Sequence, residues 1–161
     1  MRRGNKGFTL IELLIVIAII GIIAAIAIPS LLRSRMSANE AAAVGGLKTV
    51  AAAETDYNNN ALPHTFTGSL ADLGTGAGAG NVRFLDPAMA AGLKSGYTYE
   101  LAAGDTIVGP NGPQVWTWSA TAWPVVYRST GVRSFYIDES GVIRAEDNAG
   151  ARITVDSMAI E

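Results

Sequence analysis

The sequence contains no cysteine and a single histidine in its 161 residues. The missing cysteines exclude disulfides, thiolate zinc sites and cysteine nucleophiles. The histidine, His64, follows a proline in a turn-like stretch and belongs to no triad, HExxH or SxxK spacing. These absences predict a protein that is not an enzyme and that holds no metal and no cofactor.

Charge is also scarce, at 16% of residues with a formal net charge of -2. Three of the cations, Arg2, Arg3 and Lys6, lie in the first seven residues, which hold no acid, so the remainder is distinctly acidic. A nucleic-acid partner is therefore not indicated, because it would need clustered basic side chains to neutralise phosphates.

What the sequence does have is a long apolar run, with twenty uncharged residues over positions 13–32. As a helix this run would measure about 30 Å, the thickness of a bilayer's hydrocarbon core. The basic residues before it favour a cytoplasmic N-terminus, although Arg33 and Arg35 beyond it weaken that bias. A secretory signal peptide, a simple membrane anchor and a buried core helix are the ordinary alternatives.

Glu12 fits none of these alternatives well, because a carboxylate at the edge of an apolar span needs water or a partner. The span itself holds no cation. A cut before Phe8 would create an α-amine about one helical turn from Glu12. That amine could pair with its own Glu12 or with the Glu12 of a neighbouring chain.

The stretch KGFTLIELLIVIAIIGIIAAIAIP over residues 6–29 resembles the N-terminal signature of type IV pilins and type II secretion pseudopilins. The resemblance implies that a prepilin peptidase cuts between Gly7 and Phe8 and that Phe8 is then N-methylated. It also implies that Glu12 guides assembly by pairing with the N-terminal amine of a neighbour. Pro29 and Gly21 weaken a helix locally, and the resemblance implies that the segment between them opens in the filament.

Beyond Pro29, helix-forming composition continues to about Tyr57, with an apolar stripe that predicts packing against a sheet. From Tyr97, short segments rich in aromatic and β-branched residues predict antiparallel strands. The clearest hairpin is SFYIDESGVIRAE, with Gly141 at its turn. RITVD near the C-terminus is also expected to form a strand. The glycine run at 74–80 lacks the features of a phosphate-binding loop and predicts a flexible loop.

Two further groups of residues, one acidic and one aromatic, are expected to have structural roles and no binding function. The acids Asp138, Glu139, Glu146 and Asp147 are expected to be solvated, and Asp86 with Pro87 is not followed by the tryptophan and glycine of a pseudopilin calcium motif. The aromatics are expected to pack in the sheet's core: Trp116, Trp118, Trp123, Tyr127, Phe135 and Tyr136. Because the chain has no cysteine, its C-terminal segment must be held by pairing, burial or neighbouring subunits.

The expected fold is the α+β fold of type IV pilins, a long N-terminal helix packed against a C-terminal antiparallel sheet. Five parts are expected: a leader over 1–7, a membrane and filament-core helix over 8–32, its amphipathic continuation over 33–57, a connecting region over 58–96 and the sheet with its tail over 97–161.

The resemblance implies a structural subunit of a pilus, held in the bacterial inner membrane and then polymerised into an extracellular filament. Its partners would be the lipid bilayer before assembly, a prepilin peptidase, the inner-membrane assembly platform and further copies of itself. The alternatives are a secretion pseudopilin or minor pilin, and a membrane-anchored periplasmic binding module that does not polymerise.

Overall fold

The computed structural model describes residues 7–110 and 112–154. The chain divides into two compact units, Met1–Arg35 and Met36–Glu161, and each is described by itself. The leader residues Arg2, Arg3 and Lys6, which carry the expected basic charge, lie outside the described residues.

Helix α1 (Leu10–Asn60) contributes to both units. In the first unit its large apolar side chains are exposed, from 46% for Val16 to 76% for Leu10. In the second unit α1 buries one face, with residues three or four apart as a helical stripe requires. The buried residues are Ala43, Gly46, Leu47, Val50, Ala53, Glu54 and Tyr57.

The end of α1 differs from the expectation, because the helix runs to Asn60 rather than to Tyr57. The Asn60 amide donates a hydrogen bond to the carbonyl of Asp56 at 2.7 Å, so the asparagine cluster extends the last turn instead of ending it. Pro29 and the glycine pair Gly45 and Gly46 lie within the helix and do not interrupt it.

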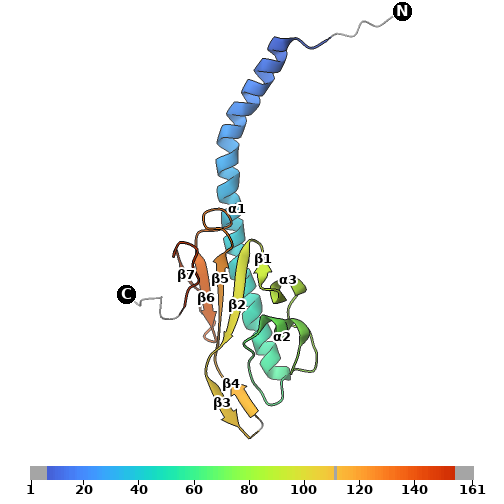
Figure 1. Ribbon diagram of the computed structural model, residues 1–161, viewed down its shortest axis with the longest axis vertical. Coiled ribbons are helices and arrows are strands. Elements are labelled where there is room, and N and C mark those ends of the chain that lie inside the picture. The colour runs from blue at the N-terminus through green and yellow to red at the C-terminus, as the bar shows by residue number, and fades with distance from the viewer. Residues whose placement is uncertain (1–6, 111, 155–161) are drawn as a thin grey trace, which may run out of the picture. The chain divides into compact units, whose positions relative to one another are not determined.

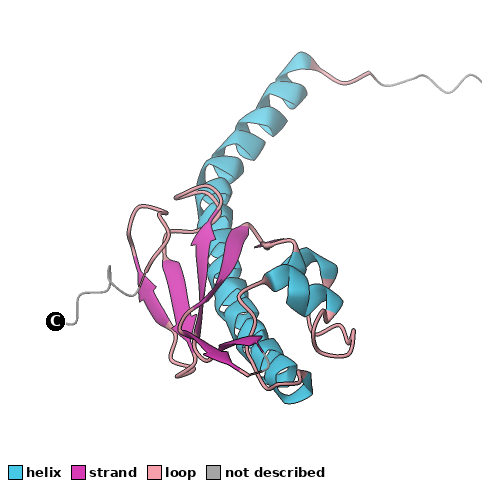
Figure 2. Cartoon of the chain, turned by 60° about the horizontal axis from the view of Figure 1, so that its bottom comes forward, coloured by secondary structure: helices cyan, strands magenta, loops and turns pink. Residues whose placement is uncertain are grey.

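A five-stranded antiparallel sheet covers the buried face of α1 within the second unit (Figure 2). Its strands follow the order β1-β2-β5-β6-β7. Their bounds are β1 (Leu93–Lys94), β2 (Tyr97–Ala103), β5 (Trp118–Pro124), β6 (Ser134–Asp138) and β7 (Arg144–Glu146). The expected hairpin is confirmed as β6 and β7, with Gly141 in the turn at a φ of 73°.

Close contact between helix and sheet depends on a glycine. A Cβ added at Gly46 would meet the Tyr99 hydroxyl at 2.6 Å and the Met89 methyl at 2.8 Å. Tyr99 projects from β2 toward the helix and is 4% exposed. Gly46 therefore sets how closely the tyrosine approaches α1, which explains a glycine in a buried helical turn.

A separate two-stranded sheet, β3 (Thr106–Gly109) and β4 (Gly112–Val115), lies between β2 and β5 in the sequence. Figure 1 shows this hairpin beyond the ends of those two strands. The aromatic segment QVWTWS has the composition of a single strand, but it divides between β4 and β5. Trp116 lies at the division and is 54% exposed, so its expected place in the core is wrong.

The connecting region holds two short helices, α2 (Leu70–Thr75) and α3 (Pro87–Ala90). The side chain of Ser69 caps α2, and that of Asp86 caps α3 with Pro87 in its first turn. The glycine run is anchored, because Tyr57 donates a hydrogen bond to the carbonyl of Ala77 at 2.8 Å. Gly76 has a φ of 72°, and a Cβ there would meet the Val82 carbonyl.

The C-terminal segment is held without a disulfide. Arg152 pairs with Glu100 of β2 at 2.9 Å, and Ser134 of β6 donates a hydrogen bond to the carbonyl of Ala151 at 2.8 Å. Ile153 is fully buried. Residues 152–154 are not in a strand, contrary to the expectation for RITVD, and the last two residues of that segment lie outside the described residues.

Together these elements confirm the expected fold class. A long N-terminal helix packs against an antiparallel sheet, which is the α+β arrangement of type IV pilins. The core lies between the second part of α1, strands β2, β5 and β6, and the short helices.

Candidate functional site

The candidate site lies at the start of α1, where Gly7, Phe8 and Glu12 are found. Thr9 precedes the helix, and its hydroxyl accepts a hydrogen bond from the backbone N–H of Glu12 at 3.3 Å. In return, Glu12 Oε2 accepts from the Thr9 backbone N–H at 2.9 Å and from the Thr9 hydroxyl at 2.6 Å. This reciprocal pattern is a capping box, which satisfies donors that the first helical turn leaves unpaired.

The capping box gives Glu12 a partner within its own chain that is not a cation. Sequence reasoning missed Thr9, although the spacing T-x-x-E before an apolar run is the signal for this motif. Both hydrogen bonds to the carboxylate reach Oε2, and among the described residues none reaches Oε1. The box therefore orients the carboxylate and leaves one of its oxygens able to accept another donor.

Gly7 and Phe8 lie just before the helix. A Cβ built on Gly7 would meet nothing within 4 Å, so the described fold does not itself require glycine at this position. Phe8 is 83% exposed. Both residues are accessible, and neither contributes to packing within the described part of the chain.

Gly21 and Pro29 both lie inside α1, where the described helix is continuous. A side chain at Gly21 would likewise meet nothing within 4 Å. Pro29 removes one backbone donor from the helical ladder. These positions are weak points in an unbroken helix, and they lie in its exposed, apolar part.

The apolar surface of this helix is its dominant physical property. Within the described residues, α1 is long and apolar enough to cross a membrane by length and composition. The large exposed side chains include Leu13, Ile17, Ile20 and Leu31, each at least 54% exposed. Exposing so large an apolar surface to water is unfavourable, so lipid or other protein is expected to cover it.

Another glutamate of α1, Glu54, lies at 0% exposure in the core of the second unit. Its Oε2 accepts a hydrogen bond from the Thr67 backbone N–H at 3.0 Å, whereas Oε1 has no partner. Burial raises the pKa of Glu54 to about 8, against a weaker lowering by the Thr67 hydrogen bond. The core therefore holds this carboxyl in its neutral form near neutral pH.

Other residues weighed from the sequence do not form a catalytic or metal site in the described structure. His64 is exposed and hydrogen-bonds through Nδ1 to the carbonyl of Asn58. Asp138 pairs with Arg144 at 2.8 Å, and Asp147 accepts from the Tyr127 hydroxyl at 3.0 Å. Among the described residues, acids and histidine gather in no group of three able to hold a metal ion.

Comparison with known proteins places the decisive feature at the same N-terminal segment. A family described as the prokaryotic N-terminal methylation motif matches residues 2–28. The chain carries the prepilin motif of the type IV pilin and pseudopilin superfamily. The motif covers the basic leader, Gly7, Phe8, the capping box and the first part of α1.

Curated relatives agree with the prepilin motif. The type IV wide pilus major component of Thermus thermophilus is 68% identical over 38 residues, which cover 24% of this chain and 29% of that protein. The type IV major pilin protein of Myxococcus xanthus is 47% identical over 53 residues, covering 33% and 24%.

Core protein G of the Pseudomonas aeruginosa type II secretion system is 41% identical over 69 residues, covering 42% of this chain and 49% of that protein. The chain thus matches about a quarter to a half of the length of these relatives. No solved structure matches the chain significantly.

Proposed function

We propose that this chain is the structural subunit of a type IV pilus, made as a membrane-bound precursor and polymerised through residues 8–32. The observation that carries the proposal is an apolar helical surface, 46% to 76% exposed at its large side chains, most of which lies within a prepilin motif. Lipid covers this surface before assembly, and neighbouring subunits cover it afterwards. The role is structural and involves no catalysis by this chain.

Processing removes residues 1–7. A prepilin peptidase cuts between Gly7 and Phe8, and Phe8 is then methylated on its new amine. The accessibility of both residues supports this, as does a glycine that the described fold does not require. The basic leader keeps the N-terminus in the cytoplasm, so the second unit lies on the outer side of the inner membrane until it enters the extracellular filament.

Assembly then depends on Glu12. The capping box fixes one carboxylate oxygen to Thr9, and the other accepts a hydrogen bond from the α-amine of a neighbouring subunit. An unpaired carboxylate is costly in an apolar environment, so a misplaced subunit is penalised. Opening of the helix between Gly21 and Pro29 would let the packed helices adjust during polymerisation at the assembly platform.

The relatives named pilins or fimbrial proteins favour this function over a secretion pseudopilin. They also disfavour a binding module that does not polymerise. The N-cap formed by Asp86 gives the Asp-Pro pair a structural use in this chain, which fits the absence of the pseudopilin calcium motif.

The experiment is expression in a piliated host that lacks its own major pilin, followed by electron microscopy of sheared filaments. Gly7→Ala should leave the full-length precursor in the membrane and give no filaments. Gly45→Ala is the matched control, because a Cβ there also meets nothing within 4 Å. Filaments of normal number from Gly7→Ala would contradict the processing step.

Glu12 is tested in the same host. Glu12→Ala should be inserted and cleaved but assemble poorly, whereas Glu139→Ala, at an exposed glutamate of the second unit, should assemble normally. Wild-type filament numbers from Glu12→Ala would remove the assembly role from this carboxylate.

A further inference from the structure

The β3–β4 hairpin exposes apolar side chains that the fold leaves uncovered. Ile107 is 58% exposed and Val108 is 81% exposed, although both lie in a strand of high β propensity. Strand β3 pairs with β4 on one side only, so its other edge is open in the described structure. Exposed apolar edge strands are sites at which another chain docks unless the sequence blocks them.

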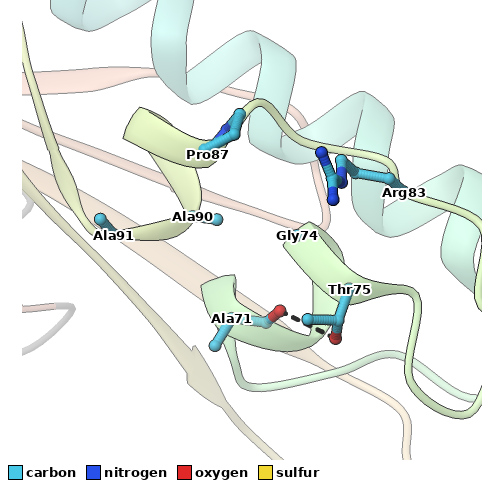
Figure 3. A pocket seen from close by; sticks show the side chains of 7 residues that line it. All are labelled: Ala71, Gly74, Thr75, Arg83, Pro87, Ala90 and Ala91. Carbon is cyan, nitrogen blue, oxygen red and sulfur yellow. Dashed lines mark hydrogen bonds between the residues drawn. The ribbon is translucent and has the colours of Figure 1, made fainter.

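A hollow of about 320 Å³ lies between α2 and α3 in the same unit (Figure 3). Its walls are mostly small and apolar, with Ala71 from α2 and Pro87 and Ala90 from α3. A Cβ at Gly74 would meet the Ala90 methyl, so this glycine allows the two helices to approach and form the floor. We name this feature the α2–α3 groove.

Charge distinguishes the two surfaces. Among the described residues that line the groove, Arg83 alone is charged, and Figure 3 shows its guanidinium beside the hollow. The hairpin and its flanks, residues 104–117, carry one charge, that of Asp105. Neither Arg83 nor Asp105 has an ion-pair partner among the described residues. Asp105 and Ile107 are two residues apart, so an extended chain places them on the same face.

We propose that the β3–β4 hairpin of one subunit docks into the α2–α3 groove of a second copy of this chain, with Asp105 facing Arg83. The proposal rests on the proposed function, which places many copies side by side. The two surfaces differ, so the contact is heterologous, and a heterologous contact that does not close into a ring propagates as an open filament. It adds a contact between second units to the one made by the apolar helices.

Cysteine cross-linking tests the contact directly, because the natural chain has no cysteine to give a background. Chains carrying both Ile107→Cys, on the face that Asp105 shares, and Ala71→Cys are assembled into filaments, treated with a mild oxidant and separated on a non-reducing gel. A ladder of dimers, trimers and longer species is expected. Mixed filaments of the two single variants should give dimers only.

The matched control joins Val126→Cys with Ala71→Cys. Val126 is a similarly exposed residue in the loop after β5, at 53% exposure, and should give no ladder. Absence of a ladder from the Ile107 pair in intact filaments overturns the proposal, as does an equally strong ladder from the Val126 pair. If the wild-type chain forms filaments but the double-cysteine chain gives no cross-link, the proposed pilus function still holds and only the contact is wrong. If the wild-type chain forms no filaments, the pilus function itself is contradicted.

A charge exchange gives an independent readout. Arg83→Asp and Asp105→Arg should each lower the number of filaments that survive shearing several-fold, and the double variant should restore it. Circular dichroism checks that each variant is folded, which is expected because both side chains are exposed. If the double variant loses as many filaments on shearing as the two single variants together, these charges do not face each other.

Discussion

The two units of the chain place the same kinds of residue in opposite environments along one helix. Leu31 of α1 is 54% exposed, whereas Leu47, on the same helix, is fully buried against the sheet. Both parts are rich in helix-forming apolar residues. The difference shows that the second part of α1 finds its partner within the chain, while the first part needs a partner outside it.

The glutamates repeat this contrast. Glu12, at the start of the exposed part, has a local capping role and one oxygen available to a further partner. Glu54, in the buried part, has a backbone N–H as its partner, and its second oxygen is unsatisfied within the core. Glu12 therefore keeps an oxygen available outside its own unit, whereas Glu54 is a carboxyl group that the core holds neutral.

The largest expected effect is a pH dependence that only the second unit should show. The pKa of Glu54 is raised to about 8 in the folded chain from 4.5 in the unfolded chain, so the folded state binds more protons between these values. The contribution of Glu54 to the free energy of unfolding should therefore be greatest below pH 4.5, fall as the pH rises to 8 and then level off. The total loss should be about 3–5 kcal/mol.

Glu54→Gln should flatten this profile, because an amide has no proton to lose in that range. The measurement is denaturant unfolding of the full chain in detergent micelles at several pH values. Tryptophan fluorescence follows it, since Trp116, Trp118 and Trp123 all belong to the second unit. An unchanged profile in Glu54→Gln would remove Glu54 as its source.

Matched leucine truncations on α1 test the contrast next. Leu47→Ala leaves a cavity in the core and should lower the free energy of unfolding by about 3 kcal/mol. Leu31→Ala should leave tryptophan-detected unfolding unchanged and should instead reduce filament yield. If both changes lowered the free energy of unfolding equally, the two parts of α1 would not differ in the way described.

A smaller effect is expected where α1 meets the loop before β6. Glu40 accepts hydrogen bonds from the Val132 N–H at 3.0 Å and from the Arg133 guanidinium at 2.7 Å. Partial burial alone would raise the pKa of Glu40, but these donors outweigh it and hold the pKa below its ordinary value. Glu40→Gln should cost about 1–2 kcal/mol at neutral pH.

This contribution has the opposite pH dependence to that of Glu54. It should be present above the unfolded pKa of 4.5 and lost as the pH falls through the lowered value in the folded chain. Unfolding curves of the wild type and Glu40→Gln should therefore converge at low pH. A difference that persists in strong acid would point to packing rather than to charge.

The smallest effect belongs to the capping box. Thr9→Ala should destabilise the first turn of α1 by about 1 kcal/mol, without changing the second unit. Faster amide hydrogen exchange over residues 10–14 in micelles measures this. Thr55→Ala is the control, because that hydroxyl donates to the carbonyl of Ala51 within the helix, far from the first turn. Equal exchange in the wild type and Thr9→Ala would show that the box is not formed.

The sequence was most informative where periodicity and composition dominate. The long helix, the β6–β7 hairpin and the α+β class all followed from the spacing of apolar residues and turn residues. Strand division between β4 and β5 did not, because Trp116 has the β propensity of a core strand and is nonetheless exposed. Local propensity does not reveal which strand has a covering layer.

Side-chain partners were harder to predict than elements. The capping box was readable from Thr9 and Glu12, since its signal is local. The burial of Glu54 was not, because it depends on Thr67 and the connecting region folding over that turn of α1. The groove between α2 and α3 likewise requires two short helices to meet at Gly74, a long-range contact with no local signal.

The most direct test of the central claim is mass spectrometry of the chain in purified filaments. The account predicts a mature chain that begins at Phe8, carries one added methyl group on its α-amine and lacks residues 1–7. Filaments built from chains that retain residues 1–7, or from chains that begin at any other residue, would contradict it.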